Sequence, residues 1–346
     1  MTFPGILGHG PVIARLAQAA VGRRPHHAYI FHGPEGVGRR RVALALARAL
    51  NCDVASQPTL GLDTGNAPAF CGACPSCKRI DAATDPDVWT VSPSALRGGG
   101  PRSLRVDVVR ETRGRLAYRL PDERFRVVVF DDTELMTVNA ANSLLKTLEE
   151  PPERTVIVLI TRRLGQLLPT VRSRCLQVAF GRLDVGQVTE YLVERAGLPR
   201  EEAEQRAAAS GGAIGRALTL SLDEMAAERE LLERLFAAQQ ARTPVRMELA
   251  AEIARAQAEA RRANNDLLRG FLTTADEVIR DALAMASAPD LPLRRPDCQS
   301  LAHELCTGYD AAILLRRLEG LEQARDRLER NVNPQLVLEA MLLEVA

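Results

Sequence analysis

The chain has 346 residues, of which 46% are hydrophobic and 26% charged, so it is long enough for two or three ordinary globular domains. Its formal net charge of +1 neither indicates nor excludes contact with nucleic acid, because a local basic surface can hide in a balanced total. No run approaches the roughly 20 apolar residues of a membrane span, and residues 1–10 lack a signal-peptide pattern. We therefore expect a soluble, cytoplasmic protein without a membrane partner.

The first half of the chain alternates short apolar runs with stretches of helical spacing. The apolar runs predict buried strands at residues 28–31, 88–91, 127–130, 156–160 and 176–180. The helical spacing predicts helices at residues 12–21, 42–51, 106–117 and 138–148. This alternation is typical of an α/β domain whose parallel sheet is covered by helices on both faces.

The strand signal disappears after residue 180. Helices are predicted at residues 184–196, 200–210 and 214–220, and long helices rich in Ala, Leu, Arg and Glu follow from residue 223. Asn333 is a plausible cap for a last helix that begins with Pro334. The predicted organisation is an α/β domain followed by all-α domains, with bounds 1–181, 182–222 and 223–346.

A phosphate-binding loop with altered chemistry follows the first apolar run. The segment Gly33–Arg40 leads into a helical stretch, which is the context of a G-x-x-x-x-G-K-[ST] loop whose N–H groups cradle phosphates. Arg39 replaces the lysine, and Arg40 replaces the hydroxyl that would bind Mg²⁺. Because Mg²⁺ requires oxygen ligands, Arg40 cannot bind it. The loop keeps the glycines Gly33, Gly36 and Gly38.

Two acids follow the apolar run at residues 127–130. In an ATPase with this loop, the first acid would bind Mg²⁺ and the second, usually glutamate, would polarise the attacking water. Asp131 suits the first role, whereas Asp132 is one methylene group shorter than glutamate. The alternative is that both acids only end a strand and cap the next helix.

Four of the seven cysteines are grouped in a module of about residues 52–77. Three of them form C-x-x-C-x-x-C, and clustered thiols in a cytosolic chain indicate a metal site before disulfides. Four thiolates suit a closed, structural Zn²⁺ site, although an iron–sulfur cluster and unrelated cysteines remain alternatives. The predicted ligands are Cys52, Cys71, Cys74 and Cys77.

The segment Asn142–Pro152 resembles the clamp-loader branch of the AAA+ superfamily. Members of that branch share N-A-L-L-K-T-L-E-E-P-P at this place, and the chain differs only at Ser143. The resemblance includes the phosphate loop and the cysteines and covers roughly residues 5–220. It extends to the segments 26–29, 155–160, 168–175, 211–217 and 333–339.

Within this branch the chain most resembles the delta-prime family of bacterial DNA polymerase III subunits. The gamma/tau motor subunits are the competing assignment, but they require an intact lysine and hydroxyl, and this chain has Arg39 and Arg40. The resemblance implies an AAA+ core with a zinc insertion, a helical lid and a helical collar domain, without ATP hydrolysis by this chain. A stand-alone, zinc-containing nucleic-acid-binding protein is a further alternative.

The delta-prime resemblance also implies partners. It implies a hetero-pentamer with gamma/tau and delta subunits that loads the sliding clamp onto primer–template DNA. The chain would be a part of the DNA polymerase III holoenzyme without catalysis of its own.

The resemblance further assigns roles to single residues. Arg174, within Ser173–Cys175, would be an arginine finger for the ATP of a neighbouring subunit, and the alternative is an arginine that caps a strand or pairs with an acid. Arg216 matches the lid arginine that contacts nucleotide phosphate in active relatives, and Thr161 matches their polar sensor after a strand. Beside the altered loop these are vestigial positions, and we expect both residues to be structural here. Asp85–Asp87 is Asp-Pro-Asp where the family has His-Pro-Asp.

Overall fold

A computed structural model describes residues 2–54, 68–93, 103–117, 123–238, 242–262, 267–288, 290–329 and 332–344. The chain forms two compact units, Met1–Leu183 and Asp184–Ala346. The division lies two residues beyond the predicted domain boundary at residue 181. The predicted boundary at residue 222 lies inside the second unit and stays a prediction. Residues 55–67 of the predicted zinc module lie outside the described residues.

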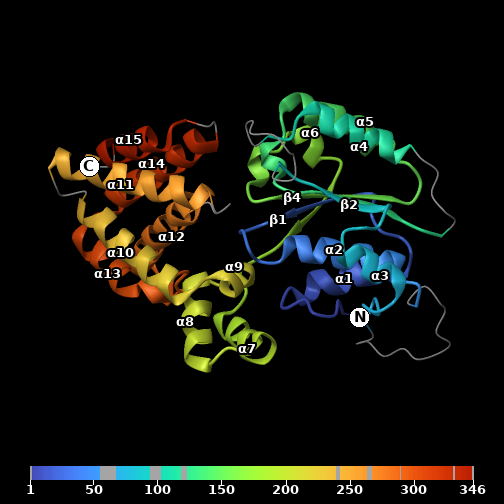
Figure 1. Ribbon diagram of the computed structural model, residues 1–346, viewed down its shortest axis with the longest axis horizontal. Coiled ribbons are helices and arrows are strands. Elements are labelled where there is room, and N and C mark those ends of the chain that lie inside the picture. Colours follow the sequence, from blue (N-terminus) through green and yellow to red (C-terminus); the bar gives the residue numbers. More distant parts are fainter. Residues whose placement is uncertain are drawn as a thin grey trace. The chain divides into compact units, whose positions relative to one another are not determined.

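The first unit is built from alternating strands and helices (Figure 1). In chain order its elements are α1 (Gly10–Val21), β1 (Ala28–His32), α2 (Arg39–Asn51), α3 (Pro75–Asp81), β2 (Val88–Val91), α4 (Val106–Leu116), β3 (Arg126–Phe130), η2 (Thr133–Leu135), α5 (Val138–Glu149), β4 (Thr155–Thr161), η3 (Leu164–Gln166), α6 (Pro169–Arg172) and β5 (Leu176–Ala179).

The described strands form one parallel sheet with the order β2-β3-β4-β1-β5. Strand β1 is central, with Ala28 opposite Ile157 of β4 and Tyr29 opposite Leu176 of β5. Figure 1 shows α1, α2 and α3 on one face of the sheet and α4, α5 and α6 on the other. The carboxyl ends of all five strands therefore lie at one edge, and their amino ends lie at the opposite edge.

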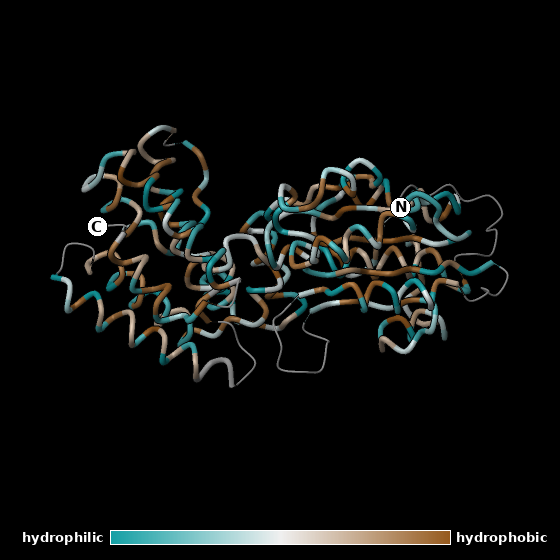
Figure 2. The backbone as a smooth tube through the Cα atoms, turned by 90° about the horizontal axis from the view of Figure 1, so that it is seen from above, coloured by the Kyte–Doolittle hydropathy of each residue, from teal (hydrophilic) through white to brown (hydrophobic). Residues whose placement is uncertain are grey.

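Strands β1, β3 and β4 are buried on both faces, which explains why they are almost continuously apolar (brown in Figure 2), whereas the edge strand β5 is largely exposed. Side chains alternate between the faces, so Tyr29 and Phe31 pack with α1 and α2, while Ala28 and Ile30 pack with α4 and α5. Strands β1, β3 and β4 thus join two hydrophobic layers. The sheet provides a rigid base for the loops at its two edges.

The second unit is all-helical within its described residues. Its elements are α7 (Val185–Ala196), α8 (Arg200–Ser210), α9 (Ile214–Thr219), α10 (Leu222–Ala238), α11 (Thr243–Arg262), α12 (Leu267–Ser287), η4 (Pro296–Cys298), α13 (Gln299–Gly308), α14 (Ala311–Glu329) and α15 (Pro334–Glu344). Asp184 caps α7 by accepting a hydrogen bond from the Gln187 N–H, and Asn333 accepts one from the Gln335 N–H at the start of α15.

The predicted fold class is confirmed, because a parallel sheet with helices on both faces precedes a helical region. The strand predicted at 176–180 is one residue shorter, and the prediction that it is buried was wrong, because β5 forms the edge of the sheet and its side chains are largely exposed. The helix predicted at 42–51 begins earlier, at Arg39, within the segment Gly33–Arg40. Among the described residues, no helix is both long and apolar enough to cross a membrane.

Candidate functional site

The phosphate loop depends on its glycines, because Gly33, Gly36 and Gly38 all have a positive φ, where other residues are strained. Gly33 follows β1 with φ +144°, and an added Cβ would lie 2.1 Å from the Phe180 carbonyl oxygen. Gly38 immediately precedes α2 with φ +98°, in the left-handed region that favours glycine. The loop therefore has the strand–turn–helix form of a phosphate-binding loop.

The arginine in the lysine position is hydrogen-bonded to the backbone at the end of β4. Arg39 is 8% exposed, and its Nη1 donates to the backbone carbonyl of Thr161 at the end of β4. Burial lowers the pKa of Arg39, and the neighbouring Arg162 adds to this effect. Thr161 is itself buried, with its hydroxyl oxygen accepting from the Arg163 N–H. A hydrogen bond thus connects Arg39, in the lysine position of the loop, to Thr161, and both positions contact nucleotide in active relatives.

An ion-pair network, which the sequence did not indicate, closes the carboxyl edge of the sheet. Arg162 directly follows Thr161 in the chain, and its guanidinium lies 3.0 Å from Glu35 of the phosphate loop, 2.8 Å from Glu134 and 3.6 Å from Asp132. These carboxylates raise the pKa of Arg162 despite the opposing effect of its burial. Glu35 brings a negative charge into the loop, where it would repel a bound phosphate.

The two acids after β3 are in different situations. Burial raises the pKa of Asp131, although Arg40 nearby favours its charged form. Burial also raises the pKa of Asp132, to about 6, with Arg162 acting in the opposite direction. Asp132 precedes η2 in a left-handed conformation (φ 50°), and its side chain does not cap that helix. The capping alternative is therefore wrong for Asp132, which instead contacts Arg162.

Arg174 lies at the opposite edge of the sheet, just before β5. Its Nη2 is 2.6 Å from a carboxylate oxygen of Glu149 at the end of α5, and its Nη1 donates to the Thr170 carbonyl at 2.9 Å. Both side chains of the ion pair are accessible, at 36% exposed for Arg174 and 49% for Glu149. The predicted finger is thus paired with an acid, as the alternative interpretation expected, but remains within reach of solvent.

Arg216 belongs to the second unit and is engaged there. Its Nη2 lies 2.5 Å from Glu228 of α10, and its Nη1 donates to the Thr274 hydroxyl of α12 at 3.1 Å. Glu228 also lies 3.8 Å from the buried Arg295. Arg216 therefore connects α9 to the helices that follow it, and no pattern in the sequence indicates these partners.

The four predicted metal ligands come together in the first unit. The sulfur atoms of Cys52, Cys71, Cys74 and Cys77 all lie within 4.8 Å of one another. A tetrahedral Zn²⁺ site with Zn–S bonds near 2.3 Å would need sulfurs about 3.8 Å apart, so this donor set fits a metal. Hydrogen bonds from the N–H groups of Ala73 and Cys74 lower the pKa of Cys71 to about 7, which favours a thiolate ligand.

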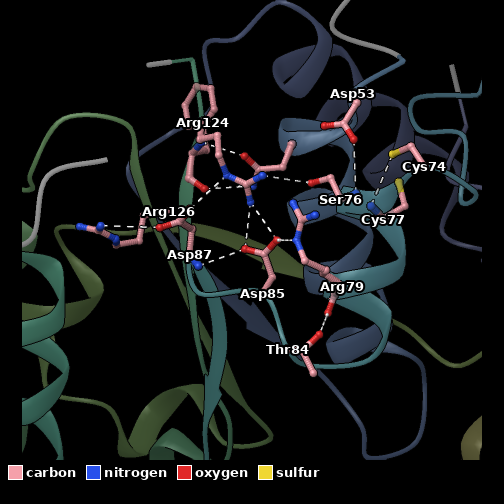
Figure 3. Close-up of polar contacts among 12 residues, drawn as sticks. Asp53, Cys74, Ser76, Cys77, Arg79, Thr84, Asp85, Asp87, Arg124 and Arg126 are labelled. Atoms are coloured by element: carbon pink, nitrogen blue, oxygen red, sulfur yellow. Dashed lines mark hydrogen bonds and ion pairs between the residues drawn. The ribbon is translucent and has the colours of Figure 1, made fainter. Parts of the chain in front are cut away.

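Asp85, the departure from the family's histidine, is the centre of a buried polar cluster beside the cysteines (Figure 3). It is 4% exposed, and both of its carboxylate oxygens accept from Arg124 at 2.9 Å. Arg124 also donates to Asp87 at 3.0 Å and to Ser76 of α3 at 3.3 Å. Arg79 of α3 donates to Asp85 at 3.4 Å. Through Ser76 and Arg79, the cluster links α3, which carries Cys77, to Arg124 in the segment before β3.

Comparison with known proteins places the chain in a family. A profile of the family described as "DNA polymerase III, delta subunit" matches residues 8–184, and a profile of its C-terminal part matches residues 227–346. The chain belongs to this family. The match confirms the family predicted from Asn142–Pro152 and the other matching segments.

Individual relatives are similar over part of the chain. The DNA polymerase III subunit delta' of Pseudomonas aeruginosa is 37% identical over 195 residues, which cover 55% of each protein. The tau subunit of Escherichia coli is 32% identical over 191 residues, covering 55% of this chain and 27% of that protein. The chain thus spans about half or less of these curated relatives. A solved gamma subunit-related protein of Thermotoga maritima aligns over 96% of this chain with 20% identity and a TM-score of 0.40.

The buried cluster generates a prediction about stability. Asp85→Ala should lower the free energy of unfolding of the first unit by about 3–5 kcal/mol, because it leaves Arg124 and Arg79 without their shared carboxylate. Urea unfolding followed by the fluorescence of Trp89, the only tryptophan of the chain, reports on this unit.

The matched control is Asp81→Ala, which removes a 49% exposed carboxylate that pairs with Arg48. It should cost less than about 1 kcal/mol. Asp85→His, which restores the family's residue, should also destabilise the unit, since it provides no carboxylate for Arg124. Equal stability of Asp85→Ala and the wild type would show that the cluster does not hold α3.

Proposed function

We propose that the chain is a delta-prime-type subunit of a clamp loader that does not hydrolyse ATP itself. In this proposal it supplies Arg174 to the ATP site of a neighbouring gamma/tau-type subunit, and so helps to load the sliding clamp onto primed DNA in the cytoplasm. The observation that carries the proposal is the separation of Arg174 from the chain's own phosphate loop by the length of the sheet.

The direction of the strands makes this separation unavoidable. The phosphate loop follows β1 and lies at the carboxyl edge, whereas Arg174 precedes β5, the neighbour of β1, and lies at the amino edge. Strands of four or five residues place these edges roughly 15 Å apart. This distance exceeds the reach of an arginine side chain. A phosphate contacted by Arg174 must therefore come from another molecule.

The chain's own loop is poorly suited to bind and hydrolyse ATP. Arg39 donates a hydrogen bond to the Thr161 carbonyl, and Arg40 has no oxygen atom that could bind Mg²⁺. Glu35 adds a negative charge to the phosphate loop. Asp132 is occupied by Arg162 and is shorter than the glutamate that activates water in ATPases. These features support a role as a rigid member of the assembly.

The proposed assembly is a hetero-pentamer with gamma/tau and delta subunits, joined through the helical carboxyl-terminal domain. The sliding clamp and primer–template DNA would be partners of the assembled complex. The profile match at residues 227–346 supports the assignment of the carboxyl-terminal domain to this family. The similarity to tau and delta' chains supports gamma/tau-type subunits as the neighbours in the complex.

We further propose that the metal held by the four cysteines is Zn²⁺. When bound, Zn²⁺ would supply structural cross-links and no reactivity, because four thiolates leave no open coordination position. Cys74 and Cys77 lie at the start of α3 and in its first turn, so the metal would fix the same helix as the Asp85 cluster.

The isolated chain should show no ATP turnover above the buffer rate, and Asp131→Ala should leave that result unchanged. The physical reason is the absence of an oxygen ligand at Arg40 together with the internal use of Arg39. A coupled assay of phosphate release tests this, with the assembled complex as the positive control. Turnover by the isolated chain that disappears in Asp131→Ala would establish the motor-subunit alternative instead.

Arg174→Ala should leave the assembly of the complex intact and reduce the ATPase rate of the neighbouring site by about 10³-fold or more. Arg174→Lys should not restore the rate, because an ammonium group lacks the planar donor fork of guanidinium. The ATPase rate and clamp loading are measured in the reconstituted complex.

The matched control for Arg174 is Arg154→Ala, which removes an exposed arginine from the turn before β4. It should leave the ATPase rate of the complex within about twofold of wild type. An unchanged rate in Arg174→Ala, with assembly intact, would refute the finger assignment.

Elemental analysis of the purified chain should find one zinc ion per molecule. Cys77→Ser should lose the metal and destabilise the first unit, since binding of a structural metal contributes to folding. Cys306→Ser, which changes a cysteine outside the cluster, should keep it. Iron in place of zinc, or full metal content in Cys77→Ser, would contradict the zinc proposal.

A further inference from the structure

The side chain of Arg174 is folded back onto acceptors of its own chain. Its Nη1 donates to the Thr170 carbonyl of α6 at 2.9 Å and to the Ser173 hydroxyl at 3.4 Å. Its Nη2 lies 2.6 Å from Glu149 Oε1. Both terminal nitrogens of the guanidinium therefore have partners within the chain. These are the nitrogens through which a planar guanidinium binds two phosphate oxygens at once.

Packing fixes the backbone beneath this ion pair. Leu148, which precedes Glu149 in α5, and Val171 of α6 are buried members of one hydrophobic cluster. The Arg174 N–H also donates to the Val171 carbonyl at 3.2 Å. Because both backbones are held, the ion pair can open by rotation of the two side chains, without a change in the sheet or the helices.

Glu149 stands where an acid is locally unfavourable. It is the last residue of α5, and the negative end of a helix dipole lies at its carboxyl end. Neither the helix dipole nor capping therefore favours a carboxylate at this position. The guanidinium of Arg174 does favour it, at 2.6 Å. The contact with Arg174 thus accounts for Glu149 better than the stability of α5 does.

The ion pair is weak enough for a phosphate to displace the carboxylate. The side chains are 36% exposed for Arg174 and 49% for Glu149, and ion pairs open to water contribute little stability. A terminal phosphate carries about two negative charges and three acceptor oxygens, so it competes well with a single carboxylate. As long as Glu149 is paired, however, it neutralises the guanidinium and repels an approaching phosphate.

We propose that Glu149 is a positioning residue that holds Arg174 in an inactive orientation until the ATP of a neighbouring subunit displaces it. This inference rests on the finger role of Arg174 proposed above and adds a control of that finger. When the neighbour's γ-phosphate approaches the amino edge, Arg174 exchanges the carboxylate for phosphate oxygens. Glu149 contacts no nucleotide and acts only through Arg174.

Glu149→Gln tests the inference, because it keeps the size of the side chain and removes its charge. In the reconstituted complex without clamp or DNA, the neighbouring site should hydrolyse ATP about two- to fivefold faster than in the wild type. A fivefold gain corresponds to about 1 kcal/mol, the upper end for an exposed ion pair. The gain should appear in kcat, since the finger acts on the transition state. Loss of a merely structural contact would not accelerate the reaction.

The matched control is Glu150→Gln, which makes the same change of charge at the next, exposed residue. It should keep the wild-type rate, because Glu149 still holds the finger. Glu149→Gln combined with Arg174→Ala should be as slow as Arg174→Ala alone, because Glu149 acts through the arginine.

The outcomes separate this inference from the finger role itself. If Arg174→Ala is slow but Glu149→Gln has the wild-type rate or a lower one, the holding role of Glu149 is refuted and the finger stands. If Arg174→Ala has the wild-type rate, the finger and its control are both refuted. An equal gain in Glu150→Gln would show a general effect of surface charge and would also overturn the inference.

Discussion

The direction of the strands in the parallel sheet is the constraint on which the rest of the first unit depends. It places everything that follows a strand, including Gly33–Arg40, Asp131 and Thr161, at one edge, and the residues that precede β5 at the other. Arg174 and the chain's own phosphate loop therefore face different surroundings. In the proposed assembly, Arg174 at the amino edge of this chain therefore serves a nucleotide bound by another subunit.

Internal pairing explains how the charges at the nucleotide positions are compensated within the fold. Arg39 donates to a backbone carbonyl, Arg162 gathers the acids around the loop, and Arg216 is paired with Glu228 in the second unit. Each charge thus has a partner within the chain, so no bound nucleotide is needed to compensate it.

Local pattern was enough to predict the fold, because buried strands such as β1, β3 and β4 must be apolar and helices must show helical spacing, but it wrongly predicted that β5, whose side chains are largely exposed, is buried. It was also enough to predict the cysteine cluster, whose members are close in sequence apart from Cys52. The pairing of Arg162 with Glu35 and of Arg124 with Asp85 could not be predicted in this way. Their partners are 127 and 39 residues apart, and only the packed sheet brings them together. The structural role of Asp85 therefore follows from its buried contacts with Arg124 and not from the local sequence.

The most direct test of the central claim is a structure of the assembled complex bound to a transition-state analogue of ATP hydrolysis. In that structure the loop Gly33–Arg40 should hold no nucleotide. Arg174 should have left Glu149 and should contact the γ-phosphate mimic bound to the neighbouring subunit. Nucleotide bound in the chain's own loop, or Arg174 still paired with Glu149 beside an occupied neighbouring site, would contradict it.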